Sequence, residues 1–290
     1  MAQRLFVFGL GYSATALVRR LNDAGGWTIA GTSRSDEGVA TLAQAGIDAH
    51  RFASDAPLTD AGLGALAEAT HILSSVPPDE DGDPVLRLHG PAIAASDAIW
   101  IGYLSTTGVY GDTGGDWVDE SAPVQPSGPR GERRAAAEKD WLALGGGKLP
   151  VHIFRIAGIY GPGRNALAQL RAGTARRTDK PGHLFSRIHV EDIAAALAAS
   201  MAKPNPGAIY NLCDDRPAPG PDVVTFAAGL LGVEPPPLVP FENAELSPMA
   251  ASFYADNRRV RNDRIKQELG VALAYPDYEA GLRALFDTGE

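Results

Sequence analysis

Short apolar runs alternate with segments of helical periodicity from Arg4 to Ile156. The runs that predict strands are Arg4–Phe8, Trp27–Thr32, Asp48–Arg51, His71–Ser75, Ile99–Leu104 and Val151–Ile156. Between them, apolar positions recur at helical spacing in Ser13–Ala24, Asp36–Ala45, Asp60–Ala67, Val85–Ala95 and Glu132–Leu144. This alternation predicts an α/β fold, in which right-handed crossovers build a doubly wound parallel sheet with helices on both faces.

The rhythm changes after residue 162. Here we expect helices at Arg164–Gly173, Asp192–Ala202, Asp222–Leu231, Arg264–Leu269 and Tyr278–Phe286, and short strands at Arg187–Val190 and Ala208–Cys213. The sequence therefore predicts a Rossmann-type core over residues 1–162, with late core elements within 185–215. Residues 163–290 are expected to form mainly a small C-terminal substrate lobe.

Composition narrows the class of partner. The chain has 290 residues and a net charge of −9, which argues against binding to nucleic acid or to an anionic membrane surface. Its one cysteine, Cys213, excludes an intramolecular disulfide framework and fits a reducing compartment. That cysteine lies in a strand-like run, so we expect it to be buried rather than nucleophilic. With no signal sequence and no apolar run of about 18 residues, a cytoplasmic location is expected.

The first strand runs directly into a glycine turn of the form G-x-G-x-x-A. Gly9 allows the tight turn, Gly11 lets the backbone approach a pyrophosphate, and the small Ala14 allows close helix packing. Free N–H groups at the start of the helix, at Tyr12 and Ser13, then face the phosphates. The motif predicts a dinucleotide-binding site; the alternative is a glycine turn without a ligand.

The end of the second strand indicates which dinucleotide the site would bind. It reads Thr32, Ser33, Arg34, Ser35, and the first acid is Asp36. An NAD site uses a carboxylate near this position for the ribose 2′-hydroxyl, whereas hydroxyls and a guanidinium suit a 2′-phosphate. The sequence therefore favours NADP over NAD, unless Arg34 is only a solvated loop residue.

Two further strand ends should meet the cofactor at the carboxyl edge of the sheet. Ser75, Val76 and Pro77 follow the fourth strand, and Ser105 ends the fifth. The alternative for the loop at 75–77 is an ordinary proline turn.

Three more motifs follow in order: LSTTGVYG at 104–111, FRIAGIYGPGR at 154–164 and RIHVEDIA at 187–194. With the glycine turn, they resemble the extended short-chain dehydrogenase/reductases, the NAD(P)-dependent epimerase/dehydratase group, over about residues 4–287. The resemblance implies hydride exchange between NAD(P) and a small-molecule substrate, often a nucleotide-sugar, under a closing C-terminal lobe. It also implies a hydroxyl that polarises the reacting oxygen, here Thr106, a Tyr-x-x-x-Lys pair for acid–base work, and a homodimer through the helices that flank the sheet.

The chain departs from that pattern at the pair. Matching Glu138 to the acid that follows the pair places Arg130 at the tyrosine position and Arg134 at the lysine position. Arginine keeps its proton, so Arg130 cannot be the base. Arg134 could replace the lysine as a fixed cation, and Arg130 could bind an anionic substrate group. The alternative is a solvated helix face, or one paired with Glu132 or Glu138.

Another residue must then move the proton. Tyr110 is one candidate and Tyr160 a second, although each could instead be structural. His189 is expected at a helix entrance, and the arginines at 34, 130 and 134 are expected to gather at one cleft. Two hypotheses remain: an NADP-dependent oxidoreductase or epimerase-like enzyme of an atypical type, and an NADP-binding sensor or scaffold without turnover.

Overall fold

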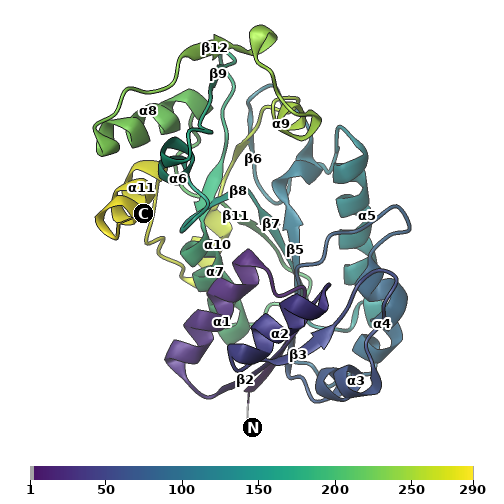
Figure 1. Cartoon of the computed structure of the whole chain (residues 1–290). Coiled ribbons are helices and arrows are strands. Elements are labelled where there is room, and N and C mark those ends of the chain that lie inside the picture. Colours follow the sequence, from purple (N-terminus) through teal and green to yellow (C-terminus); the bar gives the residue numbers. More distant parts are fainter. Residues whose placement is uncertain (1–2, 290) are drawn as a thin grey trace.

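The computed structural model describes residues 3–289 and is built around a seven-stranded sheet (Figure 1). The strands of this sheet are β1 (Gln3–Phe8), β2 (Trp27–Ser33), β3 (Asp48–Arg51), β4 (His71–Ser74), β5 (Trp100–Thr106), β7 (Val151–Ile156) and β11 (Ile209–Leu212). Their order is β11-β7-β5-β4-β1-β2-β3, and every neighbouring pair is parallel. The predicted α/β class with a parallel Rossmann-type sheet is confirmed.

Helices cover both faces of the sheet. The helices of the chain are α1 (Tyr12–Ala24), α2 (Asp36–Gln44), α3 (Asp60–Ala67), α4 (Pro84–Ala94), α5 (Pro129–Ala143), α6 (Ala166–Arg171), α7 (Val190–Ala202), α8 (Gly220–Leu231), α9 (Pro248–Phe253), α10 (Asp263–Leu269) and α11 (Tyr278–Asp287), and not all of them lie on the sheet. Leu17 of α1 and Leu197 of α7 are fully buried in one apolar layer, and Ile93 of α4 and Trp141 of α5 in the other. Each such side chain contributes about 1.5–3 kcal/mol by leaving water. Within residues 3–289, none of these helices combines the length and apolar character needed to cross a bilayer.

The chain changes direction across the sheet between β1 and β4. From β1 the strands run outward through β2 to β3, and from β4 they run the opposite way through β5 and β7 to β11. Ligands of open α/β sheets bind outside the carboxyl ends of the strands at such a switch point. Phe8 and Ser74 end these two strands side by side, so the glycine turn and the loop after β4 meet at this place.

Smaller strand pairs join segments that lie far apart in the sequence. They are β8 (Gly158–Tyr160) with β10 (Arg187–His189), β9 (Arg177–Asp179) with β12 (Leu238–Pro240), and β6 (Trp117–Val118) with β13 (Arg259–Val260). Single-turn helices η1 (Thr107–Tyr110), η2 (Leu144–Gly147) and η3 (Phe241–Asn243) complete the chain. Figure 1 shows α6, α8, α9, β9 and β12 gathered at one end of the molecule, away from the N-terminus.

Two helix starts differ from the sequence prediction and matter for the site. Helix α5 begins at Pro129 rather than Glu132, because proline is favoured in the first turn of a helix and Gly128 precedes it in an extended conformation. Arg130 therefore lies in the first turn of α5. Helix α6 begins after Asn165, whose side chain caps it, so Arg164 stands before the helix and not inside it.

Candidate functional site

The glycine turn is held from behind by side chains of two other strands. Gly9 has φ +75° and donates its N–H to Thr32 Oγ1 at 2.8 Å, while Ser75 Oγ donates to the carbonyl of Gly9. A Cβ atom on Gly9 would lie 3.0 Å from Val76 Cγ2 and 3.1 Å from Ser75 Oγ. Thr32 is 1% exposed, which corrects the expectation that its hydroxyl faces a 2′-phosphate. Thr32 and Ser75 instead fix the shape of the turn.

The open side of the turn carries the start of α1. No side chain caps this helix, and a Cβ on Gly11 would meet only the carbonyl oxygen of Gly9, at 3.9 Å. Ser13 and Ala14 are buried beneath the turn, and Tyr12 is exposed. Backbone N–H groups and the positive end of the helix dipole therefore face open space, which fits the pyrophosphate of a dinucleotide.

Arg34 lies at the carboxyl end of β2, directly beyond the glycine turn. Its side chain is exposed, and no carboxylate of residues 3–289 forms an ion pair with it. Asp36 pairs with Arg51 instead, at 3.8 Å. Ser33 is half-buried, and Ser35 accepts the N–H of Gly38 as the cap of α2. Among residues 32–35, Arg34 is therefore the side chain that could bind an anionic group of a ligand.

Strand β5 ends in two hydroxyls that face different ways. Thr106 is half-buried, and its Oγ1 accepts the N–H of Gly108 at 3.1 Å. Because that bond uses the oxygen, the hydroxyl hydrogen can still donate to a substrate. Ser105 is buried and donates to Glu138 Oε1 at 2.5 Å. The prediction of Ser105 as a cofactor residue is therefore corrected, since its side chain points into the core.

Tyr110 lies in the same buried network. Arg155 Nη2 and Glu138 Oε2 are 2.7 Å apart, with both side chains 5% exposed or less. Arg155 Nη1 donates to the Tyr110 hydroxyl, which donates to Asn211 Oδ1 at 2.8 Å. Burial raises the pKa of Tyr110, which is 2% exposed. This position corrects the expectation of Tyr110 as a proton donor at the sheet edge. Glu138 likewise belongs to Arg155 and not to the exposed face of α5.

Arg134 and Arg130 lie on the first two turns of α5. Arg134 Nη1 donates to the carbonyl of Leu104 at 2.7 Å and to the hydroxyl of Tyr103 at 3.0 Å, which fixes a positive charge at the end of β5. Arg130 is exposed, and its guanidinium carbon lies 5.9 Å from the ring centre of Phe253 on α9. Arg130 thus faces the C-terminal part of the chain.

A third arginine of this region was not predicted from the sequence. Arg258 Nη1 donates to the carbonyl of Gly111 at 2.8 Å and to Asp256 Oδ2 at 2.9 Å. Its Nη2 would lie 3.8 Å from a Cβ on Gly108, the residue that Thr106 caps. Sequence periodicity does not point to this residue, because the strand beside it, β13, is too short to show a pattern.

The expectation that the arginines at 34, 130 and 134 gather at one cleft is wrong. Arg34 follows β2, whereas Arg130 and Arg134 flank the end of β5, three strands away. At about 4.8 Å per strand this separation is roughly 14 Å. The positive groups thus lie at two separate places along one sheet edge.

The remaining candidates have structural positions. Tyr160 is 8% exposed and donates to the carbonyl of Asp277 at 3.2 Å, which corrects its expected role as an alternative proton donor. His189 caps α7, as predicted, with Nδ1 accepting the N–H of Glu191. Cys213 is fully buried, as predicted, and burial raises the pKa of its thiol.

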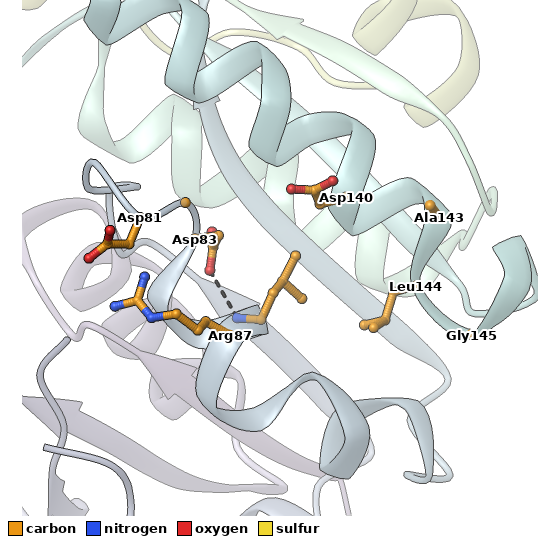
Figure 2. Close-up of a pocket in the computed structure, with 9 residues that line it drawn as sticks. Asp81, Asp83, Arg87, Asp140, Ala143, Leu144 and Gly145 are labelled. Atoms are coloured by element: carbon orange, nitrogen blue, oxygen red, sulfur yellow. Dashed lines mark hydrogen bonds between the residues drawn. The ribbon is translucent and has the colours of Figure 1, made fainter. Parts of the chain in front are cut away.

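An open hollow of about 470 Å³ lies between α4 and α5 (Figure 2). Asp83 at the start of α4 accepts the N–H groups of Val85 and Leu86 through Oδ1, and the indole N–H of Trp141 through Oδ2. Arg87 at its mouth pairs with Asp79. These groups bind one another, and the hollow adds no further chemistry to the site.

A glycine turn at the switch point of a parallel sheet, with a smaller C-terminal part beyond it, defines a protein of the Rossmann-type dinucleotide-binding fold. Comparison with known proteins agrees. The chain belongs to the NAD-dependent epimerase/dehydratase-like family of atypical short-chain dehydrogenase/reductases.

Within this family, the chain is 30% identical to protein YeeZ of Escherichia coli K12 over 289 residues, covering 95% of this chain and 97% of that one. A solved structure from Silicibacter pomeroyi, described as a conserved protein of unknown function, is 50% identical over 99% of both chains, with a TM-score of 0.90. A structure from Methylobacillus flagellatus, assigned to the NAD-dependent epimerase/dehydratases, is 26% identical over 99% of both chains, with a TM-score of 0.72. No family model matches the chain.

Proposed function

We propose that the protein binds a nicotinamide dinucleotide along this sheet edge and exchanges hydride with a small polar, anionic substrate at the end of β5. The observation that carries the proposal is the start of α1, which has no side-chain cap, on a glycine turn fixed by Thr32 and Ser75. Membership of the epimerase/dehydratase-like family supports the same ligand class.

We further propose that the dinucleotide is NADP. Arg34 is exposed at the end of β2, where an NAD site would place a carboxylate. A guanidinium matches a phosphate through two parallel hydrogen bonds. The test is calorimetric titration with NADPH and NADH, using the wild-type protein and Arg34→Ala. NADPH should bind more tightly than NADH, and the substitution should weaken NADPH alone. Equal affinities of the wild type for the two cofactors would overturn the preference.

Where β5 ends, three strands away from Arg34, the chain offers a hydroxyl and fixed positive charge. A bound nicotinamide would supply the hydride donor or acceptor. Thr106 would donate its hydroxyl hydrogen to the reacting oxygen, and Arg134 would stabilise negative charge there. Arg130 would bind the anionic group of the substrate. Since both arginines keep their protons, the proton that accompanies hydride transfer would exchange with solvent or with the substrate itself.

The enzyme proposal is tested by following the absorbance of the reduced cofactor with a panel of aldehydes, ketones and nucleotide-sugars. Turnover should fall in both Thr106→Ala and Arg130→Ala. Turnover that is lost in Thr106→Ala but survives in Arg130→Ala would refute the role of Arg130 as an anion clamp.

A second candidate function is an NADP-binding sensor or scaffold without turnover. It is favoured by the burial of Tyr110 and Tyr160, which leaves no tyrosine hydroxyl from the sequence prediction exposed at the site. Tight NADPH binding with no turnover across the panel would support the sensor over the enzyme.

A further inference from the structure

The tight turn that follows β8 is rigidly built. Gly161 and Arg164 exchange two backbone hydrogen bonds of 3.0 Å across it. The side chain of Asn165 donates to the carbonyl of Gly161 at 2.9 Å and accepts the N–H of Ala168, which ties the turn to α6. The backbone of Arg164 is therefore fixed.

This turn packs against the start of α1. The Tyr12 hydroxyl donates to the carbonyl of Pro162 at 2.9 Å. A Cβ atom on Gly161 would lie 2.7 Å from that hydroxyl and 2.7 Å from Val190 Cγ1, so a larger residue would push the turn away. The contact brings a segment from residues 161–164 beside the first residue of α1, where the glycine turn ends.

Arg164 lies at this junction, close to the positive end of the α1 helix dipole. Its guanidinium carbon lies 5.9 Å from the ring centre of Tyr12, and its side chain is exposed. Within residues 3–289, no carboxylate forms an ion pair with it. A cation near the positive end of a helix dipole is unfavourable unless an anion lies between them. By contrast, Arg19 farther along α1 pairs with Glu191.

We propose that Arg164 binds the pyrophosphate of the dinucleotide, from the side opposite to the N–H groups of α1. The ring of Tyr12 would orient the guanidinium, whose planar fork suits two phosphate oxygens. This inference rests on the proposed dinucleotide binding and adds to it a ligand residue from outside the glycine motif. It divides the cofactor contacts in two: Arg34 for the 2′-phosphate and Arg164 for the pyrophosphate.

The experiment is isothermal titration of the full chain with three probes. NADPH carries both phosphate features, ADP-ribose has only the pyrophosphate, and adenosine 2′-monophosphate has only the 2′-phosphate. Arg164→Met removes the charge and keeps much of the side-chain stem. A lost charge-assisted hydrogen bond should weaken NADPH and ADP-ribose about tenfold, and leave adenosine 2′-monophosphate within about twofold. Arg164→Lys should lose less, and Arg171→Ala, an exposed arginine at the end of α6, should bind like the wild type.

Each other outcome is decisive. Unchanged ADP-ribose binding in Arg164→Met overturns the inference and leaves the proposed function intact. Equal weakening of all three probes, or the same loss in Arg171→Ala, shows damage to the fold or a general charge effect and also overturns it. A wild-type protein that binds none of the probes overturns the proposed function as well.

Discussion

The buried pair of Glu138 and Arg155 gives the sharpest prediction of stability. Arg155 donates to Glu138 from Nε at 3.1 and 3.2 Å and from Nη2 at 2.7 Å, and Ser105 adds a hydroxyl donor. Both charged side chains are 5% exposed or less. Replacing Glu138 with alanine would therefore leave a guanidinium in the core whose one remaining side-chain partner is the Tyr110 hydroxyl.

The magnitude follows from the burial of that charge. Removing one partner of a buried pair costs about 3–5 kcal/mol, because the remaining ion has neither water nor a counter-charge. Total folding stabilities are about 5–15 kcal/mol, so the substitution removes about a third to a half of a mid-range value near 10 kcal/mol. In a protein of this size each kcal/mol lowers the melting temperature by about 2–4 °C, which predicts a fall of roughly 10 °C for Glu138→Ala.

The assay is urea unfolding, followed by circular dichroism, of Glu138→Ala and of the double variant Glu138→Met/Arg155→Met. Apolar replacement of both partners removes the uncompensated charge, so the double variant should regain most of the lost stability. Tyr110 keeps Asn211 as its acceptor in that variant. A cost below about 1 kcal/mol for Glu138→Ala would refute the reasoning. So would a double variant that is less stable than the single one.

Two further predictions concern backbone geometry and pH. Gly111→Ala should destabilise the protein by more than about 3 kcal/mol, because φ is +69° there and the new Cβ would lie 1.9 Å from the carbonyl oxygen of Gln125. Gly114→Ala, at φ +64° with nothing within 4 Å, should cost only about 1–2 kcal/mol in thermal unfolding, and equal losses would contradict the steric argument. Burial raises the pKa of Asp214 from 3.8 to about 8, so in this window the folded carboxyl keeps a proton that the unfolded one releases. This group makes stability fall as pH rises through the window. In Asp214→Asn, the urea midpoint should fall less between about pH 5 and pH 9 than it does in the wild type. An equal fall in the two proteins would contradict this prediction.

The fold was predictable because its signals are local. A parallel strand buried on both faces is a continuous apolar run, and each helix between two strands shows its own 3.6-residue period. The glycine turn also predicted at which edge of the sheet a ligand binds, because the motif is informative only where it follows a strand and begins a helix. The short strands β6 and β13 were not predicted, because two residues carry no period and their pairing joins segments that lie far apart in the sequence.

The direction of the hydroxyls at the site was not predictable in the same way. Ser105 and Thr106 are neighbours in the sequence, yet one bonds Glu138 in the core and the other caps η1. One clue was present: strand β7 carries Arg155 in a short, mostly apolar run, and an arginine buried there needs a carboxylate partner. Glu138 fills that role, but only the register of α5 against β7 shows that the two side chains meet.

Arg155 differs from the arginines at the carboxyl edge of the sheet in having a carboxylate partner, and this difference bears on how an acidic chain can bind an anion. The chain carries 35 carboxylate residues against 26 cationic ones, so partners for an arginine are abundant. Arg155, in the core, has such a partner. Arg34, Arg130 and Arg164 do not have one among the carboxylates of residues 3–289, and each stands at or beside the carboxyl edge of the sheet. Repulsion by unneutralised cations is reduced when an anion binds, so these positions make the edge attractive to a phosphate-bearing ligand despite the net charge of −9. Because exposed pairs are screened by salt, that attraction should weaken steadily as ionic strength rises, whereas the contact of Arg155 with Glu138 should not.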